Sequence, residues 1–282
     1  MARLSLLIDV TRCSGCHNCF LACRDEHYGN DYPGYSAAQP LDGQFWMQVK
    51  EIERGSYPRP KVDYLAIPCQ HCAAAPCIDA AKDGAVYRRD DGIVVIDPVK
   101  AKGQPQIVQS CPYRVIYWNA DLELPQKCTL CAQRLDTGDK EPRCSESCPT
   151  GAMVFGDLDD PRSEIARRAA ALETEQLHPE YGCAPLVLYH GIPKRFVAGE
   201  VVLDDAGDAC AAGVRVALEG DGARFETTSD AFGQFEFEGL AQKARYRVSV
   251  EHPGYVSQAL DVRTDTDVYV GVVRLTPERM TR

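Results

Sequence analysis

The spacing of the cysteines constrains this chain more than any other feature. Of the fourteen cysteines, all but Cys183 and Cys210 lie before residue 150. The first four, at positions 13, 16, 19 and 23, form the C-x2-C-x2-C-x3-C run of bacterial ferredoxins. In such a run three thiolates bind one 4Fe-4S cluster, and the fourth binds the cluster of a second motif. The first half of the chain is therefore predicted to be a cofactor domain that carries electrons.

The motif is duplicated, and the copy has lost ligands. Residues 7–9 (Leu-Ile-Asp) lead into the first run, and residues 95–97 (Val-Ile-Asp) lead into a second one. The second run retains only its last cysteine, Cys111. The positions that lack a cysteine there are Ala101, Gln104 and Ile107.

The motifs that should exchange ligands with these runs show the same pattern. One is complete, with Cys128, Cys131, Cys144 and Cys148. The other has Cys69, Cys72 and Cys77, but Ala81 stands where its fourth cysteine is expected. All four missing ligands would belong to a single cluster, so we expect that one cluster site has been lost as a whole.

Ligand exchange then sorts the twelve cysteines into three sets without remainder. The set for cluster A is Cys13, Cys16, Cys19 and Cys148. The set for cluster B is Cys23, Cys128, Cys131 and Cys144. The set for cluster C is Cys69, Cys72, Cys77 and Cys111. We therefore expect three 4Fe-4S clusters.

The two remaining cysteines and the two histidines near the cluster cysteines are not expected to bind iron. Cys183 and Cys210 are expected to be free thiols, separate from the cluster loops. His17 and His71 lie between cluster cysteines. We expect solvated loop histidines, with hydrogen bonding that tunes a cluster as the alternative.

Other uses of cysteine fit the spacing less well. Disulfide scaffolds are typical of small secreted domains, whereas this chain is long enough to bury an ordinary core. Structural zinc can use four cysteines, but three closely spaced cysteines favour a cubane cluster. A radical enzyme that uses S-adenosylmethionine would need C-x3-C-x2-C, and the required third cysteine does not follow Cys23.

Charge and hydropathy limit the partners. The net charge of -10 argues against nucleic acid or an anionic membrane surface, which are themselves negative. Apolar segments such as residues 92–96 and 184–189 are much shorter than the roughly 20 residues of a membrane helix. A signal peptide ending at the first apolar run would be cleaved beside Cys13, so we expect a first strand there. The predicted location is cytoplasmic, unless a partner carries the folded chain across a membrane.

The second half is predicted to be mainly β. Before it, Ile165, Ala169 and Leu172 form an apolar stripe behind Asp160, which indicates a capped helix over residues 160–177. A connector then runs from residue 178 to 194. Seven strand-like segments follow, at 197–203, 214–219, 224–228, 234–237, 246–250, 257–262 and 268–275. This pattern predicts a β-sandwich, and its turns resemble the transthyretin-like, carboxypeptidase-regulatory type.

These patterns together predict an α+β protein in three parts. Residues 1–159 would form a duplicated, ferredoxin-like domain with three clusters. Residues 160–195 would form a helix and a connector, and residues 196–282 a β-sandwich that serves docking or stability.

Residues 4–170 also carry motifs around each cluster loop. They are Ile8-Asp9, Pro68-Cys69-Gln70-His71-Cys72, Asp91-Gly92-Ile93-Val94, Cys111-Pro112-Tyr113, Lys127-Cys128-Thr129-Leu130-Cys131 and Cys148-Pro149-Thr150-Gly151-Ala152. In these motifs the chain resembles the iron-sulfur subunits of molybdopterin oxidoreductases related to dimethyl sulfoxide reductase. Most members hold four clusters, so three is a departure from the family pattern. The missing cluster, the insert over residues 32–59 and the added β-domain are similar to the transhydroxylases and anaerobic phenol (resorcinol) hydroxylases of this family.

The resemblance implies a non-catalytic electron-transfer subunit of a heterodimer. The large partner would hold molybdenum or tungsten on bis-molybdopterin guanine dinucleotide and would act on hydroxylated aromatics. Other interpretations are a subunit of a different molybdopterin reductase or dehydrogenase, a mainly structural cluster-bearing subunit, and a free-standing polyferredoxin.

Overall fold

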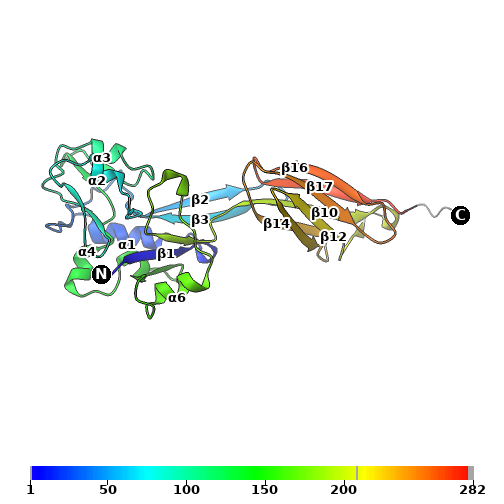
Figure 1. Cartoon of the computed structure of the whole chain (residues 1–282), viewed down its shortest axis with the longest axis horizontal. Coiled ribbons are helices and arrows are strands. Elements are labelled where there is room, and N and C mark those ends of the chain that lie inside the picture. Colours follow the sequence, from blue (N-terminus) through cyan, green and yellow to red (C-terminus); the bar gives the residue numbers. More distant parts are fainter. Residues whose placement is uncertain (1, 208, 279–282) are drawn as a thin grey trace. The chain divides into compact units, whose positions relative to one another are not determined.

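A computed structural model describes residues 2–207 and 209–278 (Figure 1). These residues form two compact units. The first contains the residues up to Ile52 together with Asp63–Ile192, and the second contains Glu53–Val62 together with the residues from Pro193 onward. Within the described ranges, no helix is both long and apolar enough to cross a membrane. The predicted boundaries at residues 159 and 195 stay a prediction.

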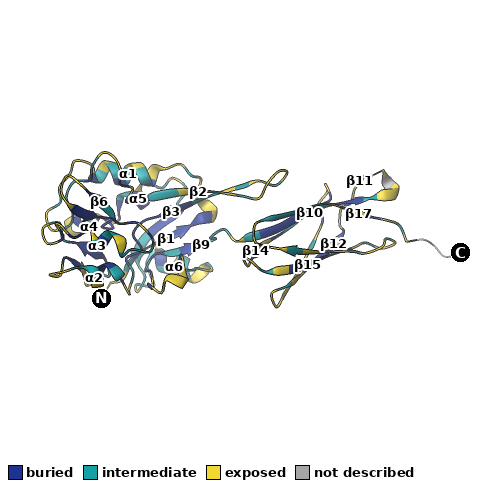
Figure 2. Ribbon diagram, turned by 90° about the horizontal axis from the view of Figure 1, so that it is seen from above, coloured by how far each residue is buried: buried dark blue, intermediate teal, exposed yellow. Residues whose placement is uncertain are grey.

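The first unit is built around the strand β1 (Leu4–Asp9). It pairs antiparallel with β8 (Met153–Asp157) and parallel with β9 (Leu188–His190). Leu6, Leu7 and Ile8 are all fully buried, because both faces of the strand are covered. Leu6 and Ile8 join the main core, whereas Leu7 packs with the helix α6 (Glu164–Ala171) on the opposite face. Strand β1 is therefore the central strand of this sheet, and Figure 2 colours residues by how far they are buried.

The helix predicted over residues 160–177 is shorter than expected. It spans Glu164–Ala171, and its cap is Ser163, whose side chain accepts a hydrogen bond from the backbone N–H of Ala166. Asp160 instead accepts from the backbone N–H of Arg162 and so closes a turn before the helix. The predicted cap was wrong because two residues of capping type compete there, and the later one satisfies the first turn. The apolar stripe does face the core, where Ile165, Ala169 and Leu172 pack together.

The rest of the first unit consists of short elements that support loops. Its hairpins are β2 (Gln48–Arg54) with β3 (Lys61–Ile67), β4 (Val86–Arg88) with β5 (Val94–Ile96), and β6 (Tyr117–Asn119) with β7 (Leu124–Gln126). Its helical segments are η1 (Val10–Arg12), α1 (Asn18–His27), α2 (Pro76–Ala80), α3 (Gln106–Gln109), α4 (Ala132–Thr137), α5 (Arg143–Glu146) and η2 (Pro179–Tyr181).

The predicted duplication has a counterpart in backbone geometry. Strand β1 ends at Asp9, whose carboxylate accepts from the backbone N–H of Thr11 at 3.1 Å. Strand β5 is followed by Asp97, whose carboxylate accepts from the backbone N–H of Val99 at 2.9 Å. The same aspartate turn therefore begins both copies of the motif.

The second unit contains a β-sandwich, as predicted. In one sheet, β10 (Arg195–Leu203) pairs with β11 (Ala209–Cys210), β14 (Gln234–Leu240) and β17 (Val268–Leu275). The other sheet has the order β13-β12-β15-β16, formed by Ala223–Thr228, Arg215–Gly220, Arg245–Glu251 and Gln258–Arg263. The seven predicted strands are confirmed; β11 and the short turn η3 (Asp204–Ala206) add to them. Val201, Phe235, Val216 and Val248 belong to the apolar core between the sheets.

The second unit also contains the tip of the β2–β3 hairpin. The buried carboxylate of Asp267 accepts from the backbone N–H groups of Gly55 at 3.3 Å and Phe196 at 3.1 Å. Lys61 from the tip forms ion pairs with Glu236 and Glu238 on β14 and lies 4.9 Å from the ring centroid of Phe196. Residues from a distant part of the sequence therefore contact the sandwich strands through hydrogen bonds and ion pairs.

Candidate iron–sulfur cluster sites

The first cluster loop contains two residues with left-handed backbones, Gly15 and His17. Gly15 has a φ of +66°, and a Cβ atom there would lie 2.5 Å from ring atoms of Tyr64. Glycine is therefore required both by the backbone and by this contact. His17, with a φ of 60°, precedes α1, which carries Cys19 and Cys23 on its buried side. These two cysteines lie one helical turn apart, so one short helix can contribute to two sites.

The thiols predicted for cluster A lie together. Burial, followed by the nearby thiols of Cys13 and Cys148, raises the pKa of Cys19 to about 12. Burial also raises the pKa of Cys13, which has Cys148 and Cys16 as neighbours. The structure therefore brings Cys148 to the first motif across more than a hundred residues, through the pairing of β1 with β8.

The thiols predicted for cluster B also lie together. Burial raises the pKa of Cys23, and Cys128 and Cys131 raise it further. Burial likewise raises the pKa of Cys144, with Cys131, Cys128 and Cys23 as neighbours. Leu130 and Cys131 both have left-handed backbones, which turn the backbone N–H of Leu130 toward Cys128 Sγ at 3.3 Å.

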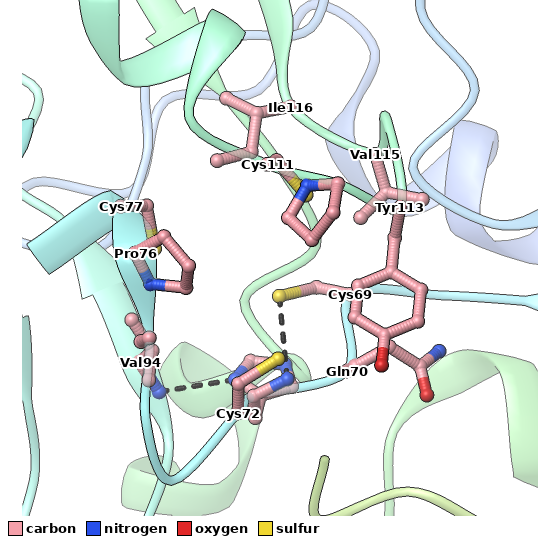
Figure 3. A pocket seen from close by; sticks show the side chains of 13 residues that line it. Cys69, Gln70, Cys72, Pro76, Cys77, Val94, Cys111, Tyr113, Val115 and Ile116 are labelled. Carbon is pink, nitrogen blue, oxygen red and sulfur yellow. Dashed lines mark hydrogen bonds between the residues drawn. The ribbon is translucent and has the colours of Figure 1, made fainter. Parts of the chain in front are cut away.

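The thiols predicted for cluster C line a single cavity (Figure 3). Cys69, Cys72, Cys77 and Cys111 surround it, together with apolar residues such as Val94 and Ile116. Burial raises the pKa of Cys77 to about 11, although the ammonium of Lys127 opposes this shift. Burial also raises the pKa of Cys111, whereas the backbone N–H groups of Val115, Tyr113 and Arg114 favour its thiolate.

These surroundings fit an iron–sulfur cluster. A buried thiol with a raised pKa stays neutral unless a cation compensates its charge, and iron supplies that compensation. The fourteen cysteines are all described, and none of them forms a disulfide. No three Cys, His, Asp or Glu side chains in residues 2–207 and 209–278 are gathered as ligands of one metal ion. For cluster C, the four thiols instead surround a cavity.

The positions of the predicted lost cluster contain packed side chains. Ala101 and Ile107 are fully buried, and Ala81 packs against the same apolar cluster. The side chain of Gln104 accepts from the backbone N–H of Lys82 and donates to the backbone oxygen of Lys100, each at 2.8 Å. Apolar packing and an amide therefore occupy the place where the repeat predicts four thiolates.

Two buried residues near the thiols were not assigned a role from the sequence. Lys127 is 3% exposed, and its ammonium donates to the backbone oxygens of Val94 and Cys128. His27 is 2% exposed, and its Nε2 lies 3.9 Å from Cys131 Sγ. Lys127 directly precedes Cys128 in the sequence, so its place near a cluster could have been predicted. No spacing relates His27 to Cys131.

Two of the expectations for neighbouring residues were wrong. His17 is exposed, as expected, but His71 is only 1% exposed and is therefore not a solvated loop residue. Cys183 is a free thiol, yet it is not separate from the cluster loops: its backbone oxygen accepts from Ala74 N at 3.0 Å. The connector that contains Cys183 pairs with the loop after Cys72, a long-range contact that spacing does not reveal. Cys210 is exposed.

Comparison with known proteins is consistent with this architecture. Residues 60–158 match the 4Fe-4S dicluster domain family, and residues 197–276 match the carboxypeptidase regulatory-like domain family. The small subunit of pyrogallol hydroxytransferase from Pelobacter acidigallici is 37% identical over 98% of this chain and 100% of that protein.

Other relatives match a smaller part of the chain. A putative dimethyl sulfoxide reductase iron-sulfur subunit from Halobacterium salinarum is 34% identical over 67% of this chain and 79% of its own length. A tetrathionate reductase subunit from Salmonella typhimurium is 34% identical over 69% of this chain and 75% of its own length.

The chain belongs to the family of iron-sulfur electron-transfer subunits of molybdopterin oxidoreductases related to dimethyl sulfoxide reductase. It therefore holds 4Fe-4S clusters and works with a larger catalytic subunit. Its fold is a ferredoxin-like cluster domain followed by a β-sandwich.

Proposed function

We propose that this chain transfers electrons for a cytoplasmic heterodimer that transhydroxylates or hydroxylates aromatic rings bearing hydroxyl groups. The large partner would hold molybdenum or tungsten on bis-molybdopterin guanine dinucleotide. Support for the substrate class comes from the pyrogallol hydroxytransferase small subunit, which is similar over 98% of this chain, including the β-sandwich. The other relatives match about two thirds of it.

The chain would hold three clusters, with ligand sets A, B and C as assigned from the spacing. The observation that carries this proposal is the meeting of distant thiols: Cys148 lies with Cys13 and Cys19, and Cys23 lies with Cys128 and Cys131. Cys111 lines one cavity with the three thiols of the loop that begins at Cys69.

The three sets would form a chain with B in the middle. Cys19 of set A and Cys23 of set B lie on the same helix, α1. The backbone N–H of Cys69, from set C, favours the thiolate of Cys128, from set B. Electrons passing between A and C would therefore use cluster B.

Each 4Fe-4S cluster, when bound, changes its charge by one electron with little movement. The residues of this chain would set how easily each charge change occurs. Burial disfavours added negative charge, whereas the ammonium of Lys127 and backbone N–H groups near the thiols favour it. The partner would carry out the chemistry on the aromatic ring.

Removal of cluster B tests this function, because B would be the middle member. Cys128→Ala is compared with Cys210→Ala, which removes an exposed thiol outside the three sets. Each variant heterodimer is purified anaerobically, checked for intact assembly, and assayed for turnover and for electron exchange with an external dye.

We expect Cys128→Ala to lose most dye-coupled activity and Cys210→Ala to keep it. Full activity of an intact Cys128→Ala heterodimer would instead support a structural role for the clusters. A chain that purifies as a stable monomer without a large partner would support the free-standing polyferredoxin.

A further inference from the structure

His71 lies in the wall of the cavity proposed for cluster C. It stands between Cys69 and Cys72, is 1% exposed, and lines the cavity together with all four thiols of the set. Its backbone is left-handed, with a φ of 44°, and its backbone N–H lies 3.5 Å from Cys69 Sγ. The side chain is therefore held within the proposed site and away from solvent.

The hydrogen bonding of the ring fixes its tautomer. Nδ1 accepts from the backbone N–H of Val94, on β5, at 3.0 Å. A backbone N–H can only donate, so Nδ1 must be the unprotonated nitrogen and Nε2 must carry the hydrogen. Burial and the nearby cations Lys127 and Arg88 lower the pKa of His71, which is consistent with a neutral ring.

The Nε2–H group has no acceptor among the described residues. It is fully buried and makes no hydrogen bond to them. An unsatisfied buried donor costs free energy, so a partner for this group is expected in the native protein. The four surrounding thiols indicate that partner, because a cluster bound in that cavity would supply sulfur acceptors.

The corresponding residues of the other two sites provide no such donor. Leu130 stands between Cys128 and Cys131, and Gly15 stands between Cys13 and Cys16. Both have left-handed backbones like that of His71, and the backbone N–H of Leu130 approaches Cys128 Sγ at 3.3 Å. The three loops therefore share one backbone geometry, and only the loop of cluster C has a side-chain donor at this position.

We propose that Nε2–H of His71 donates a hydrogen bond to a sulfur of cluster C and raises the reduction potential of that cluster. This inference rests on the proposed ligand set for cluster C. A hydrogen bond to sulfur stabilises the more negative, reduced cluster more than the oxidised one, so the potential rises. His71 would thus adjust the reduction potential of cluster C, and no change in its protonation is involved.

The test uses the holo heterodimer and a substitution that the chain itself suggests. His71→Leu places in this loop the residue found in the loop of cluster B, and His71→Gln retains an N–H donor. His17→Leu is the matched control, because His17 also lies between cluster cysteines but is exposed. Redox titrations monitored by electron paramagnetic resonance give the midpoint potential of each cluster.

We expect one midpoint potential to fall in His71→Leu, to recover at least partly in His71→Gln, and to stay unchanged in His17→Leu. The inference is overturned if His71→Leu keeps three clusters with unchanged potentials, or if all three potentials shift together.

If His71→Leu loses cluster C, a second measurement still tests the inference. Wild-type protein labelled with histidine that carries ¹⁵N only in the imidazole ring should show a ¹⁵N coupling to reduced cluster C in pulsed electron paramagnetic resonance, and absence of this coupling overturns the inference. A wild-type chain that holds only two clusters would contradict the proposed function itself, and so the two failures are distinguishable.

Discussion

The imidazole Nε2 of His27 lies 3.9 Å from Sγ of Cys131, in the core of the first unit. The ring also packs against Trp46, with 4.7 Å between centroids, and against the edge of Tyr32. Burial lowers the pKa of His27 to about 4, so the ring is neutral at pH 7. A neutral imidazole N–H can donate to a thiolate, which is an acceptor.

We predict that His27→Phe lowers the midpoint potential of cluster B. Phenylalanine preserves the aromatic packing on Trp46 but cannot donate to Cys131, so the reduced cluster loses a stabilising contact. Redox titration of the variant heterodimer checks this, with the other two clusters as internal controls. An unchanged potential for cluster B would show that the contact has no electrostatic effect.

Lys127 should affect two clusters rather than one. Its buried ammonium lies near Cys77 of set C and Cys128 of set B, and it lowers the pKa of both thiols against the effect of burial. We predict that Lys127→Met lowers the potentials of clusters B and C together, because both reduced clusters lose a nearby positive charge. The potential of cluster A should change least, and equal shifts in all three would contradict this placement.

Gly15 is predicted to be essential for cluster A. Gly15→Ala would force a Cβ atom against Tyr64 in addition to straining a φ of +66°. The control Gly84→Ala has a similar φ of +64° but meets nothing within 4 Å. We expect Gly15→Ala to lose one cluster, about four irons, by native mass spectrometry, and Gly84→Ala to lose none. Equal effects would show that backbone strain alone matters.

The sandwich strands could be predicted from sequence because each depends on a local pattern, whereas the ligand sets assigned from motif spacing stay a prediction. Ferredoxin spacing grouped Cys148 with Cys13, and alternating residues located strands such as β15. His71 and Cys183 were misjudged because their neighbours, Val94 on β5 and Ala74 in the loop after Cys72, are distant from them in sequence. The helix cap failed for a local reason, since Asp160 and Ser163 both have capping side chains.

The contribution of residues 53–62 to the second unit could not be predicted either. Nothing in the local sequence of Gly55 indicates that its N–H bonds to Asp267, 212 residues later. The alternation of residues along two strands specifies how they pair within a hairpin. It does not specify which distant carboxylate accepts the hydrogen bond from a backbone N–H at the tip.

Asp267 should therefore be important for the stability of the second unit. Its carboxylate is 2% exposed and forms ion pairs with Arg195 at 3.3 Å and Arg54 at 3.8 Å. We predict that Asp267→Ala lowers the free energy of unfolding by about 3 kcal/mol, because two partly buried arginines lose their counterion. Asp261→Ala is the control, since its carboxylate is 82% exposed; we expect a cost of at most about 0.5 kcal/mol. Chemical unfolding of the full chain measures both, and equal costs would contradict the prediction.

We propose that this chain holds three 4Fe-4S clusters and has lost the site of a fourth. Native mass spectrometry tests this proposal most directly, on the complex purified anaerobically and on this subunit released from it in the gas phase. We expect a mass above that of the polypeptide equal to three cubanes, about twelve irons and twelve sulfides. A mass that corresponds to two or four cubanes would contradict it.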